Sequence, residues 1–179
     1  VECGVWRGGS AMLIALTLIK LGENNRKIYL YDTFNGMSEP TERDYSIIEN
    51  SKDVLNKWKN KNKGKSNNWC FSDLSEVKKN MFLTKYPEEN IKFIVGKVED
   101  AIPKTMPRKI SLLRLDTDWY ESTKHELTHL FPKLVKSGVL IIDDYGRWAG
   151  AKKAVDEFFS DKLILLNRID YTGRIGLKI

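Results

Sequence analysis

Short, continuously apolar runs alternate along the chain with longer segments whose apolar positions recur at helical spacing. Continuous apolar runs are typical of strands buried on both faces of a parallel sheet, and the longer segments are typical of the helices that cover it. Ser10 stands where a first helix would begin, and Asp73 and Glu76 have capping-box spacing ahead of another. The pattern predicts strands over residues 1–3, 27–31, 91–95, 110–115 and 139–142, and helices over residues 10–21, 77–86, 121–135 and 151–159.

The C-terminal part of the pattern differs, because two predicted strands, 163–167 and 174–179, are joined only by the short turn Tyr171-Thr172-Gly173. Strands joined by so short a turn can only be antiparallel. We therefore expect an α/β fold with a doubly wound, mostly parallel sheet that ends in an antiparallel C-terminal hairpin. Residues 1–179 show no internal repeat, so we expect one domain. Because Val1 already reads as part of a strand, we expect that the natural N-terminal segment is missing.

Composition supports a globular domain, with 41% hydrophobic and 30% charged residues. The net charge of +6 is concentrated in residues 51–68, a Lys/Asn-rich segment that we interpret as a helix and a loop inserted into the fold. No arginine accompanies its lysines, so we expect a solvated insertion and consider nucleic acid an unlikely partner. The lysines that produce this charge, against Asp53 as the single acidic residue, are Lys52, Lys57, Lys59, Lys61, Lys63 and Lys65.

The cysteine count and the longest apolar run bear on the cellular compartment. Cys3 and Cys70 are far apart in the sequence, so a zinc site or a disulfide framework is not expected, and we place both thiols in the core. The apolar run 11–19 ends at Lys20 and is about half the length that a membrane span requires. We therefore expect a cytoplasmic protein with no membrane partner.

A glycine-rich loop separates the first predicted strand from the first helix, with the sequence Glu-Cys-Gly-Val-Trp-Arg-Gly-Gly-Ser over residues 2–10. Glycines in this place let the backbone approach a ligand, and the helix N-terminus offers free N–H groups to an anion. Asp32 follows the second strand, where an acidic side chain commonly accepts hydrogen bonds from ribose hydroxyls. Together these features favour a nucleoside-bearing cofactor, although the loop alone could be a simple turn. The candidate cofactor-binding residues are Glu2, Gly4, Gly8, Gly9, Ser10 and Asp32.

Four aspartates follow two neighbouring strands of the predicted sheet. Asp116 and Asp118 come directly after the fourth strand, and Asp143 and Asp144 directly after the fifth. Ligands of open α/β sheets bind at the carboxyl ends of the strands, where these side chains would meet. Carboxylates without histidine or thiol ligands favour a hard cation, and Mg²⁺ is the first choice. The alternative to a metal site, for any one of these aspartates taken alone, is that it caps a helix or lies in a solvated loop.

Four aromatic residues, Trp119, Tyr120, Tyr145 and Trp148, flank these aspartates in the sequence. They could be packing at the rim of the sheet. Aromatic faces beside a polar site also suit a sugar or another ring as substrate.

Four segments of the chain, residues 2–9, 31–37, 113–123 and 141–146, resemble the macrocin O-methyltransferase family in sequence, order and spacing. Members of this family are sugar O-methyltransferases that depend on S-adenosylmethionine and Mg²⁺. This resemblance implies a class I, Rossmann-like methyltransferase fold, metal ligation by Asp116, Asp143 and Asp144, and Asp118 as general base. It also implies that the glycine loop and Asp32 hold the cofactor, that the substrate is a small molecule with a sugar hydroxyl, and that the protein is a dimer or larger homo-oligomer. We also expect the given sequence to lack the N-terminal lid that covers the active site in this family.

Methyl transfer to a hydroxyl needs a deprotonated oxygen held in line with the methyl group, which a cation and a base together can provide. A metal-dependent glycosyltransferase is the main alternative, because an Asp-x-Asp motif after a strand can also bind the diphosphate of a nucleotide sugar through a divalent cation. This alternative leaves the glycine loop unexplained. In a dehalogenase-like phosphatase Asp116 would be the nucleophile, yet that motif belongs on the first strand. A non-catalytic nucleic-acid-binding domain would instead use the lysines.

Overall fold

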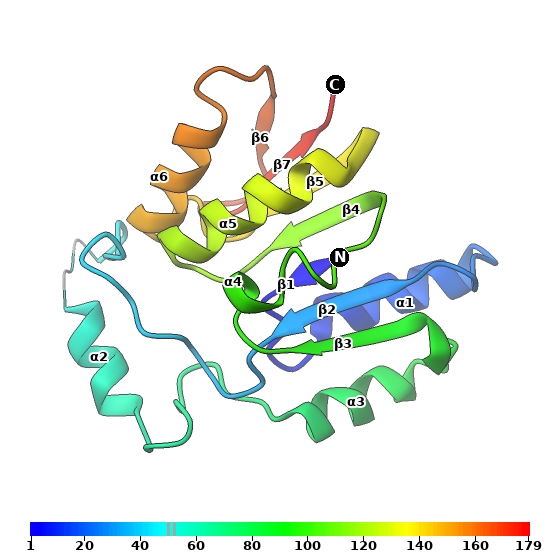
Figure 1. Ribbon diagram of the computed structural model, residues 1–179, viewed down its shortest axis with the longest axis horizontal. Coiled ribbons are helices and arrows are strands. Elements are labelled where there is room, and N and C mark those ends of the chain that lie inside the picture. Colours follow the sequence, from blue (N-terminus) through cyan, green and yellow to red (C-terminus); the bar gives the residue numbers. More distant parts are fainter. Residues whose placement is uncertain (50, 52) are drawn as a thin grey trace.

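The computed structural model describes residues 1–49, 51 and 53–179, and its centre is one seven-stranded sheet (Figure 1). The strand order is β3-β2-β1-β4-β5-β7-β6, in which β1 to β5 are parallel and β7 runs antiparallel to both β5 and β6. The predicted parallel sheet with an antiparallel C-terminal hairpin is therefore confirmed. The strands are β1 (Glu2–Cys3), β2 (Ile28–Asp32), β3 (Ile91–Val95), β4 (Ile110–Leu115), β5 (Leu134–Ile142), β6 (Leu166–Arg168) and β7 (Arg174–Leu177).

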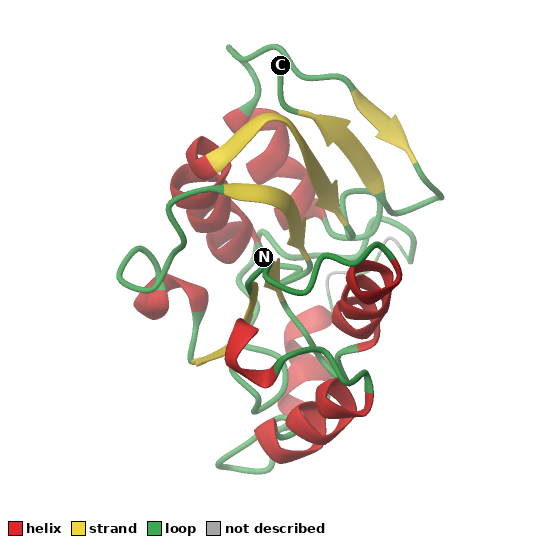
Figure 2. Cartoon of the chain, turned by 90° about the vertical axis from the view of Figure 1, so that its right-hand side faces the viewer, coloured by secondary structure: helices red, strands yellow, loops and turns green. Residues whose placement is uncertain are grey.

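Helices cover both faces of this sheet, as Figure 2 shows from the side. On one face α1 (Gly9–Lys20) and α3 (Leu74–Leu83) enclose a core with β2 and β3, and on the other α4 (Val98–Ala101), α5 (Tyr120–Leu130) and α6 (Ala149–Phe158) pack over β4 and β5. Two short 3₁₀ helices span Glu88–Asn90 and Phe131–Lys133. No helix among the described residues is long and apolar enough to cross a bilayer.

The strand order reverses at β1, which lies between β2 and β4. Parallel strands present their carboxyl ends at one edge of the sheet, and the reversal opens a crevice there between the connections that leave in opposite directions. The loops that follow β1, β2, β3, β4 and β5 therefore converge on the same edge, and the glycine loop and all four aspartates belong to these loops.

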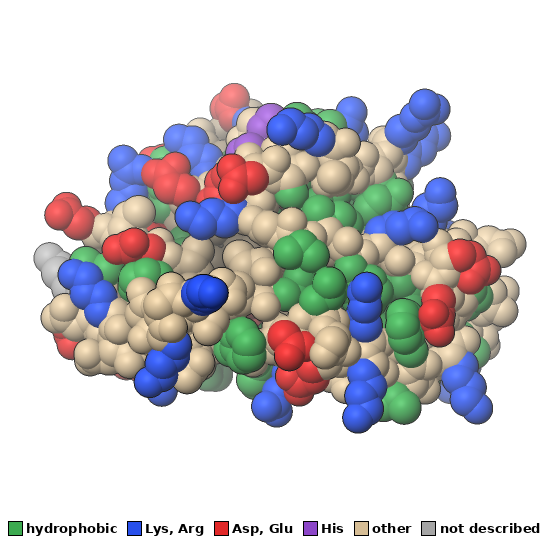
Figure 3. All heavy atoms as spheres, turned by 60° about the horizontal axis from the view of Figure 1, so that its bottom comes forward, with side chains coloured by type: hydrophobic (Ala, Val, Ile, Leu, Met, Phe, Trp, Pro, Cys, Tyr) green, Lys and Arg blue, Asp and Glu red, His purple; other side chains and the backbone are tan. Residues whose placement is uncertain are grey.

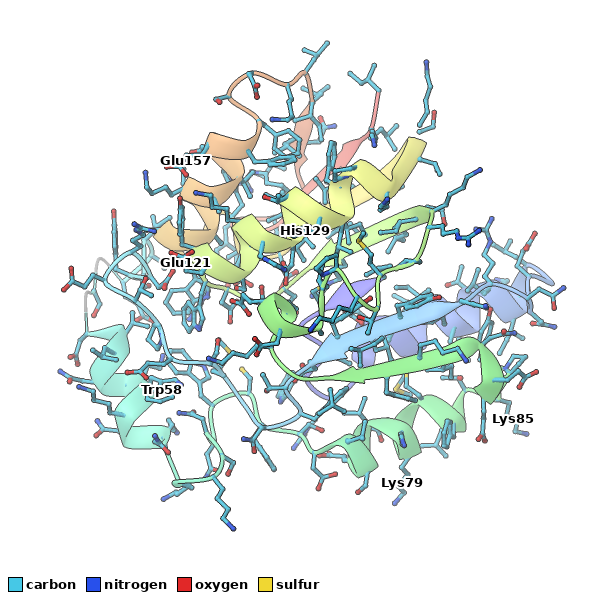
Figure 4. All side chains as sticks on the ribbon, viewed as in Figure 1. Trp58, Lys79, Lys85, Glu121, His129 and Glu157 are labelled. Carbon is cyan, nitrogen blue, oxygen red and sulfur yellow. The ribbon has the colours of Figure 1, made fainter. Side chains whose placement is uncertain are left out.

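The Lys/Asn-rich segment forms α2 (Val54–Lys61) followed by a loop, as predicted, and Lys52 lies outside the described residues. Trp58 attaches this helix to the body of the protein (Figure 4): its Nε1 donates a hydrogen bond of 2.7 Å to the carbonyl oxygen of Met37. The Asn67 side chain donates to the Trp58 carbonyl oxygen at 2.9 Å. The segment is therefore anchored to the loop after β2 and is not a detached insertion.

The end of α5 differs from the prediction of a helix over residues 121–135. The helix stops at Leu130, a 3₁₀ turn follows, and Val135 already belongs to β5. Pro132 lacks an N–H and its ring cannot be accommodated inside a helix, so the chain leaves the helix just before it.

Two further local details differ from the prediction. Helix α1 begins at Gly9, one residue before the predicted start at Ser10, Gly8 with φ of 84° occupies its N-cap, and no side chain caps it. Cys3 is buried, but Cys70 is exposed and not part of the core. Asp73 does cap α3, because its Oδ1 accepts a hydrogen bond from the Glu76 N–H at 2.8 Å.

Candidate active site

A cavity of about 360 Å³ opens at the carboxyl edge of the sheet. The loops after β1 to β5 all contribute to its wall, together with the loop that follows α2. Of the residues proposed from the sequence, those that line it are Gly4, Asp32, Asp116, Asp118, Asp143 and Asp144. The structure thus brings one end of the glycine loop and all four aspartates to a single space.

Gly4 allows the glycine loop to cross directly beside β4. Its φ is +80°, and a Cβ atom placed there would lie 1.9 Å from the carbonyl oxygen of Asp116. The backbone N–H of Asp116 donates to the Cys3 carbonyl oxygen at 2.8 Å, which holds the two segments together. Only glycine combines the left-handed backbone with this close approach.

Asp32 holds the same loop through its carboxylate. Its Oδ2 accepts hydrogen bonds from the N–H groups of Val5 at 2.7 Å and Trp6 at 3.1 Å, and Oδ1 accepts one from Phe34 at 2.7 Å. The side chain therefore builds the wall on which a ribose is expected to lie, a role that its place at the strand end did not reveal.

The other candidate cofactor residues lie away from the cavity wall. Glu2 is buried on β1 and pairs with Arg114, while Gly8, Gly9 and Ser10 form the start of α1. None of these four is among the residues that line the cavity. Their contribution to cofactor binding remains a prediction.

We expect Asp32→Ala to weaken binding of S-adenosylhomocysteine and also to lower the melting temperature. The substitution leaves three backbone N–H groups without their acceptor, and each lost hydrogen bond to a charged group costs about 1.5–3 kcal/mol. Calorimetric titration and thermal unfolding measure the two effects separately. An Asp32→Ala protein with unchanged affinity for the nucleoside would refute the placement of the cofactor beside this loop.

Three carboxyl groups meet where β4 and β5 end. One oxygen each from Asp116, Asp118 and Asp144 lies within 4.8 Å of the others. Removal from water raises the pKa of Asp118 to about 7 and that of Asp144 to about 10, and the neighbouring charges add to the shift at Asp144. Burial also raises the pKa of Asp116, against the opposing effect of Arg114. The three carboxyl groups therefore cannot all be ionised near neutral pH unless a cation compensates their charge, and without one they hold protons.

The fourth aspartate, Asp143, also lines the cavity, but it is not part of this cluster of three. Its Oδ1 lies 3.1 Å from Nη2 of Arg114, and 44% of its side chain is exposed. Arg114 is largely buried and also contacts Glu2 and Asp116, each at 2.7 Å through Nη1. The trio brought together thus contains Asp118 in place of Asp143, which differs from the ligand set that the resemblance implies.

Two tryptophans form one wall of the cavity. Trp69 and Trp148 both line it, and their rings stand edge to face with centroids 6.0 Å apart. Trp119 is buried behind them and contacts both rings. Of the aromatic residues that flank the aspartates in the sequence, Trp148 alone therefore lines the cavity, and Trp69 joins it from the loop after α2.

A sequence profile described as "Macrocin-O-methyltransferase (TylF)" matches residues 1–175. The chain belongs to this family. Demethyldecarbamoylnovobiocin O-methyltransferase from Streptomyces niveus is 31% identical over 173 residues, which are 94% of this chain and 62% of the relative. An 8-demethyl-8-(2,3-dimethoxy-alpha-L-rhamnosyl)-tetracenomycin-C 4'-O-methyltransferase from Streptomyces olivaceus is 30% identical over 99% of this chain and 59% of its own length.

The fold agrees with this membership. The structure of the O-methyltransferase NovP superposes with a TM-score of 0.83 at 29% identity, covering 99% of this chain and 70% of that one. The fold is therefore that of a class I methyltransferase, as the resemblance implied. The chain spans about 60% of the length of the curated relatives named above.

Several cavity residues were missed by sequence reasoning. Gly96 to Glu99 follow β3 and line the cavity, and their position at a strand end was a usable signal. Glu126 does not line the cavity, but it lies fully buried on α5, and its Oε1 accepts a hydrogen bond of 2.9 Å from Thr117, between the two aspartates that follow β4. Trp69 and Cys70 reach the cavity from a loop with no recognisable signal.

Proposed function

We propose that this protein is an S-adenosylmethionine- and Mg²⁺-dependent O-methyltransferase that acts on a hydroxyl of a sugar or glycosylated small molecule. The observation that carries the proposal is the convergence of Asp116, Asp118 and Asp144 beside the glycine-loop cavity, in a chain of this family. A metal-dependent glycosyltransferase would leave the glycine loop and the family membership unexplained. Transfer of a labelled methyl group to a panel of glycosides and nucleotide sugars tests the reaction directly.

The donor set fits a hard divalent cation. All its atoms are carboxylate oxygens, the ligands that Mg²⁺ prefers. Oδ2 of Asp144 is buried and has no hydrogen-bond partner among the described residues, which is costly unless a ligand completes the site. The cation would acidify and orient the acceptor hydroxyl when bound.

We propose Asp116, Asp143 and Asp144 as the metal ligands and Asp118 as the general base. The Asp143 side chain is half exposed, and the one ion pair that it forms among the described residues is with Arg114. A small rotation of the side chain would therefore free its carboxylate for the cation. Asp118 and Asp144 each have a carboxylate oxygen within 4.8 Å of the other, and removal from water raises the pKa of Asp118 to about 7, a value suited to taking a proton near neutral pH. A carboxylate there can accept the hydroxyl proton while its neighbours hold the ion.

For the cofactor, we propose that the adenosine lies between the glycine loop and the loop after β3. Gly4, Asp32 and Gly96 line this part of the cavity, and the Gly96 N–H donates to the Asp32 carbonyl oxygen at 3.0 Å. Because the carboxylate of Asp32 holds the glycine loop, Asp32 connects the two loops into one surface. We also propose a cytoplasmic protein that forms a homo-oligomer, which light scattering of the purified protein tests.

Removal of the divalent cation is expected to abolish methyl transfer. With a chelator present, the buried carboxylates repel one another and take up protons, and the acceptor hydroxyl keeps its proton. Activity should return on addition of Mg²⁺ in excess over the chelator, in a radiometric assay at constant ionic strength. Turnover at the full rate in chelator would refute the metal dependence but not methyl transfer itself.

A further inference from the structure

The loop after β4 contains a tight turn that sets the direction of Asp118. The N–H of Trp119 donates to the Thr117 carbonyl oxygen at 2.8 Å, which closes a three-residue turn with Asp118 at its centre. The φ of Asp118 is 69°, and a turn of this kind with a positive φ at its centre is the rarer and more strained form. The turn brings an oxygen of Asp118 within 4.8 Å of oxygens of Asp116 and Asp144.

Two side chains of α5 contact this turn from behind the cavity. Oε1 of Glu126 accepts a hydrogen bond of 2.9 Å from Oγ1 of Thr117, and Oγ of Ser122 donates to the Thr117 carbonyl oxygen at 3.4 Å. The second distance is at the limit of a hydrogen bond, so the contact with Glu126 is the stronger one. A strained backbone persists only where its surroundings fix it, and these contacts fix the residue that precedes Asp118.

Glu126 occupies an unusual place for an acidic residue. It is the only acidic residue among the buried residues of α5, whereas the histidines of the same helix reach the surface (purple in Figure 3). Its side chain is fully buried, and Oε2 has no hydrogen-bond partner among the described residues. Burial raises the pKa of the Glu126 carboxyl group well above its usual range, so the group holds a proton near neutral pH.

The stability of the fold does not account for this buried carboxyl group. A polar group that is only partly hydrogen-bonded costs free energy in the interior, and an apolar side chain of similar volume would avoid that cost. The one hydrogen bond between side chains that Glu126 forms among the described residues is with Thr117, at the turn. The contribution of Glu126 is therefore to be sought in the turn that it holds.

We propose that Glu126 is a positioning residue of the methyl-transfer site, which through Thr117 holds the turn that directs the Asp118 carboxyl group into the cavity. This inference rests on the proposed role of Asp118 as general base. Glu126 does not line the cavity, so it acts only through Thr117. A displacement of about 1 Å can cost roughly a hundredfold in rate, so loss of this hydrogen bond should affect the reaction more than the fold.

The test uses variants that remove the hydrogen bond from either side and variants that retain it. Thr117→Val lacks the donor and Glu126→Met lacks the acceptor, while Thr117→Ser and Glu126→Gln keep them. In methyl transfer by the full chain, the first two should lower kcat about tenfold to a hundredfold, with the KM for S-adenosylmethionine and the affinity for Mg²⁺ unchanged. The Ser and Gln variants should recover most of this loss. Equal kcat in the Val and Ser variants, or in the Met and Gln variants, would overturn the proposal.

Thr84→Val is the matched control for a buried hydroxyl. Thr84 is buried at the end of α3, its Oγ1 donates to the Met81 carbonyl oxygen at 2.6 Å, and it does not line the cavity. Its loss should lower stability in urea and leave kcat unchanged. A fall in kcat in Thr84→Val as large as that in Thr117→Val would show that the effect is one of general stability and would refute the proposed role.

A double variant shows whether Thr117 acts through Asp118. If it does, Thr117→Val should lower the rate no further in a protein that already carries Asp118→Asn, because the group being positioned is gone. The same fold-loss in both backgrounds would mean that Thr117 contributes independently of Asp118, against the proposal.

Hydrogen exchange of the Trp119 amide tests the positioning without catalysis. This N–H closes the turn, so it should exchange about tenfold faster in Thr117→Val and Glu126→Met than in the wild type, and at the wild-type rate in Thr84→Val. NMR of the folded protein measures these rates, and an unchanged rate in the first two variants would overturn the proposal. If the wild type methylates no glycoside, the proposed function fails, and the exchange rates still decide whether Glu126 holds the turn.

Discussion

Replacing Gly4 by alanine is expected to destabilise the protein severely and to abolish cofactor binding. The added Cβ would lie 1.9 Å from the Asp116 carbonyl oxygen, and the residue must keep φ of +80°. A backbone clash cannot be relieved by a change of rotamer, so β1 and β4 must move apart. Together with the cost of a left-handed residue, we expect a loss of about 3–5 kcal/mol in the free energy of unfolding. Urea unfolding and calorimetric titration with S-adenosylhomocysteine measure both effects.

Gly9→Ala is the matched control for this substitution. It lies in the same loop-helix junction, but its backbone is helical and a Cβ would meet nothing within 4 Å. Alanine in a helix is favoured over glycine by about 0.5–1 kcal/mol, so the free energy of unfolding should stay the same or rise slightly. If Gly4→Ala unfolds at the same urea concentration as Gly9→Ala, the close approach of the two segments is not what holds the site together.

The parallel sheet could be predicted because strands covered on both faces are mostly apolar, and β2, β3 and β4 are mostly apolar runs in which Lys92, Ser111 and Arg114 are the polar residues before the strand ends. The end of α5 was harder, since Leu127, Leu130 and Leu134 continue a helical spacing across the true boundary. Pro132 was the decisive signal, because a proline cannot continue the helix. Periodicity alone does not distinguish a helix that continues from one that turns into a strand.

The site could be located from the sequence, but its contacts could not. Strand ends placed Asp116 and Asp144 at the same edge of the sheet, as the structure shows. The direction of a side chain depends on local backbone angles, and Asp118, with φ of 69°, does not follow the alternation of the strand before it. The ion pair that turns Asp143 toward Arg114 likewise depends on distances between strands that no sequence spacing gives.

The proposed division between base and ligands predicts different behaviour for two conservative substitutions. Asp118→Asn keeps the shape of the side chain, and asparagine tolerates the left-handed backbone at this position. It loses the basic oxygen, so we expect turnover to fall about a hundredfold to ten-thousandfold, with cofactor and Mg²⁺ binding almost unchanged. Excess Mg²⁺ should not restore the turnover of Asp118→Asn. Methyl transfer measured over a Mg²⁺ titration, with calorimetry for ion binding, reports both quantities.

Asp116→Asn and Asp143→Asn should instead weaken the ion's binding, because an amide oxygen replaces a charged ligand, and raised Mg²⁺ should restore part of the rate. Asp143→Asn tests whether Asp143 or Asp118 is the third metal ligand, because Asp143 lies outside the cluster of Asp116, Asp118 and Asp144. If Asp143→Asn binds Mg²⁺ normally while Asp118→Asn binds it weakly and recovers with excess ion, Asp118 is the third ligand. In that case the group that takes the hydroxyl proton must be sought elsewhere on the cavity wall, where the remaining carboxylates among the described residues, apart from Asp32, are Glu99 and Asp143.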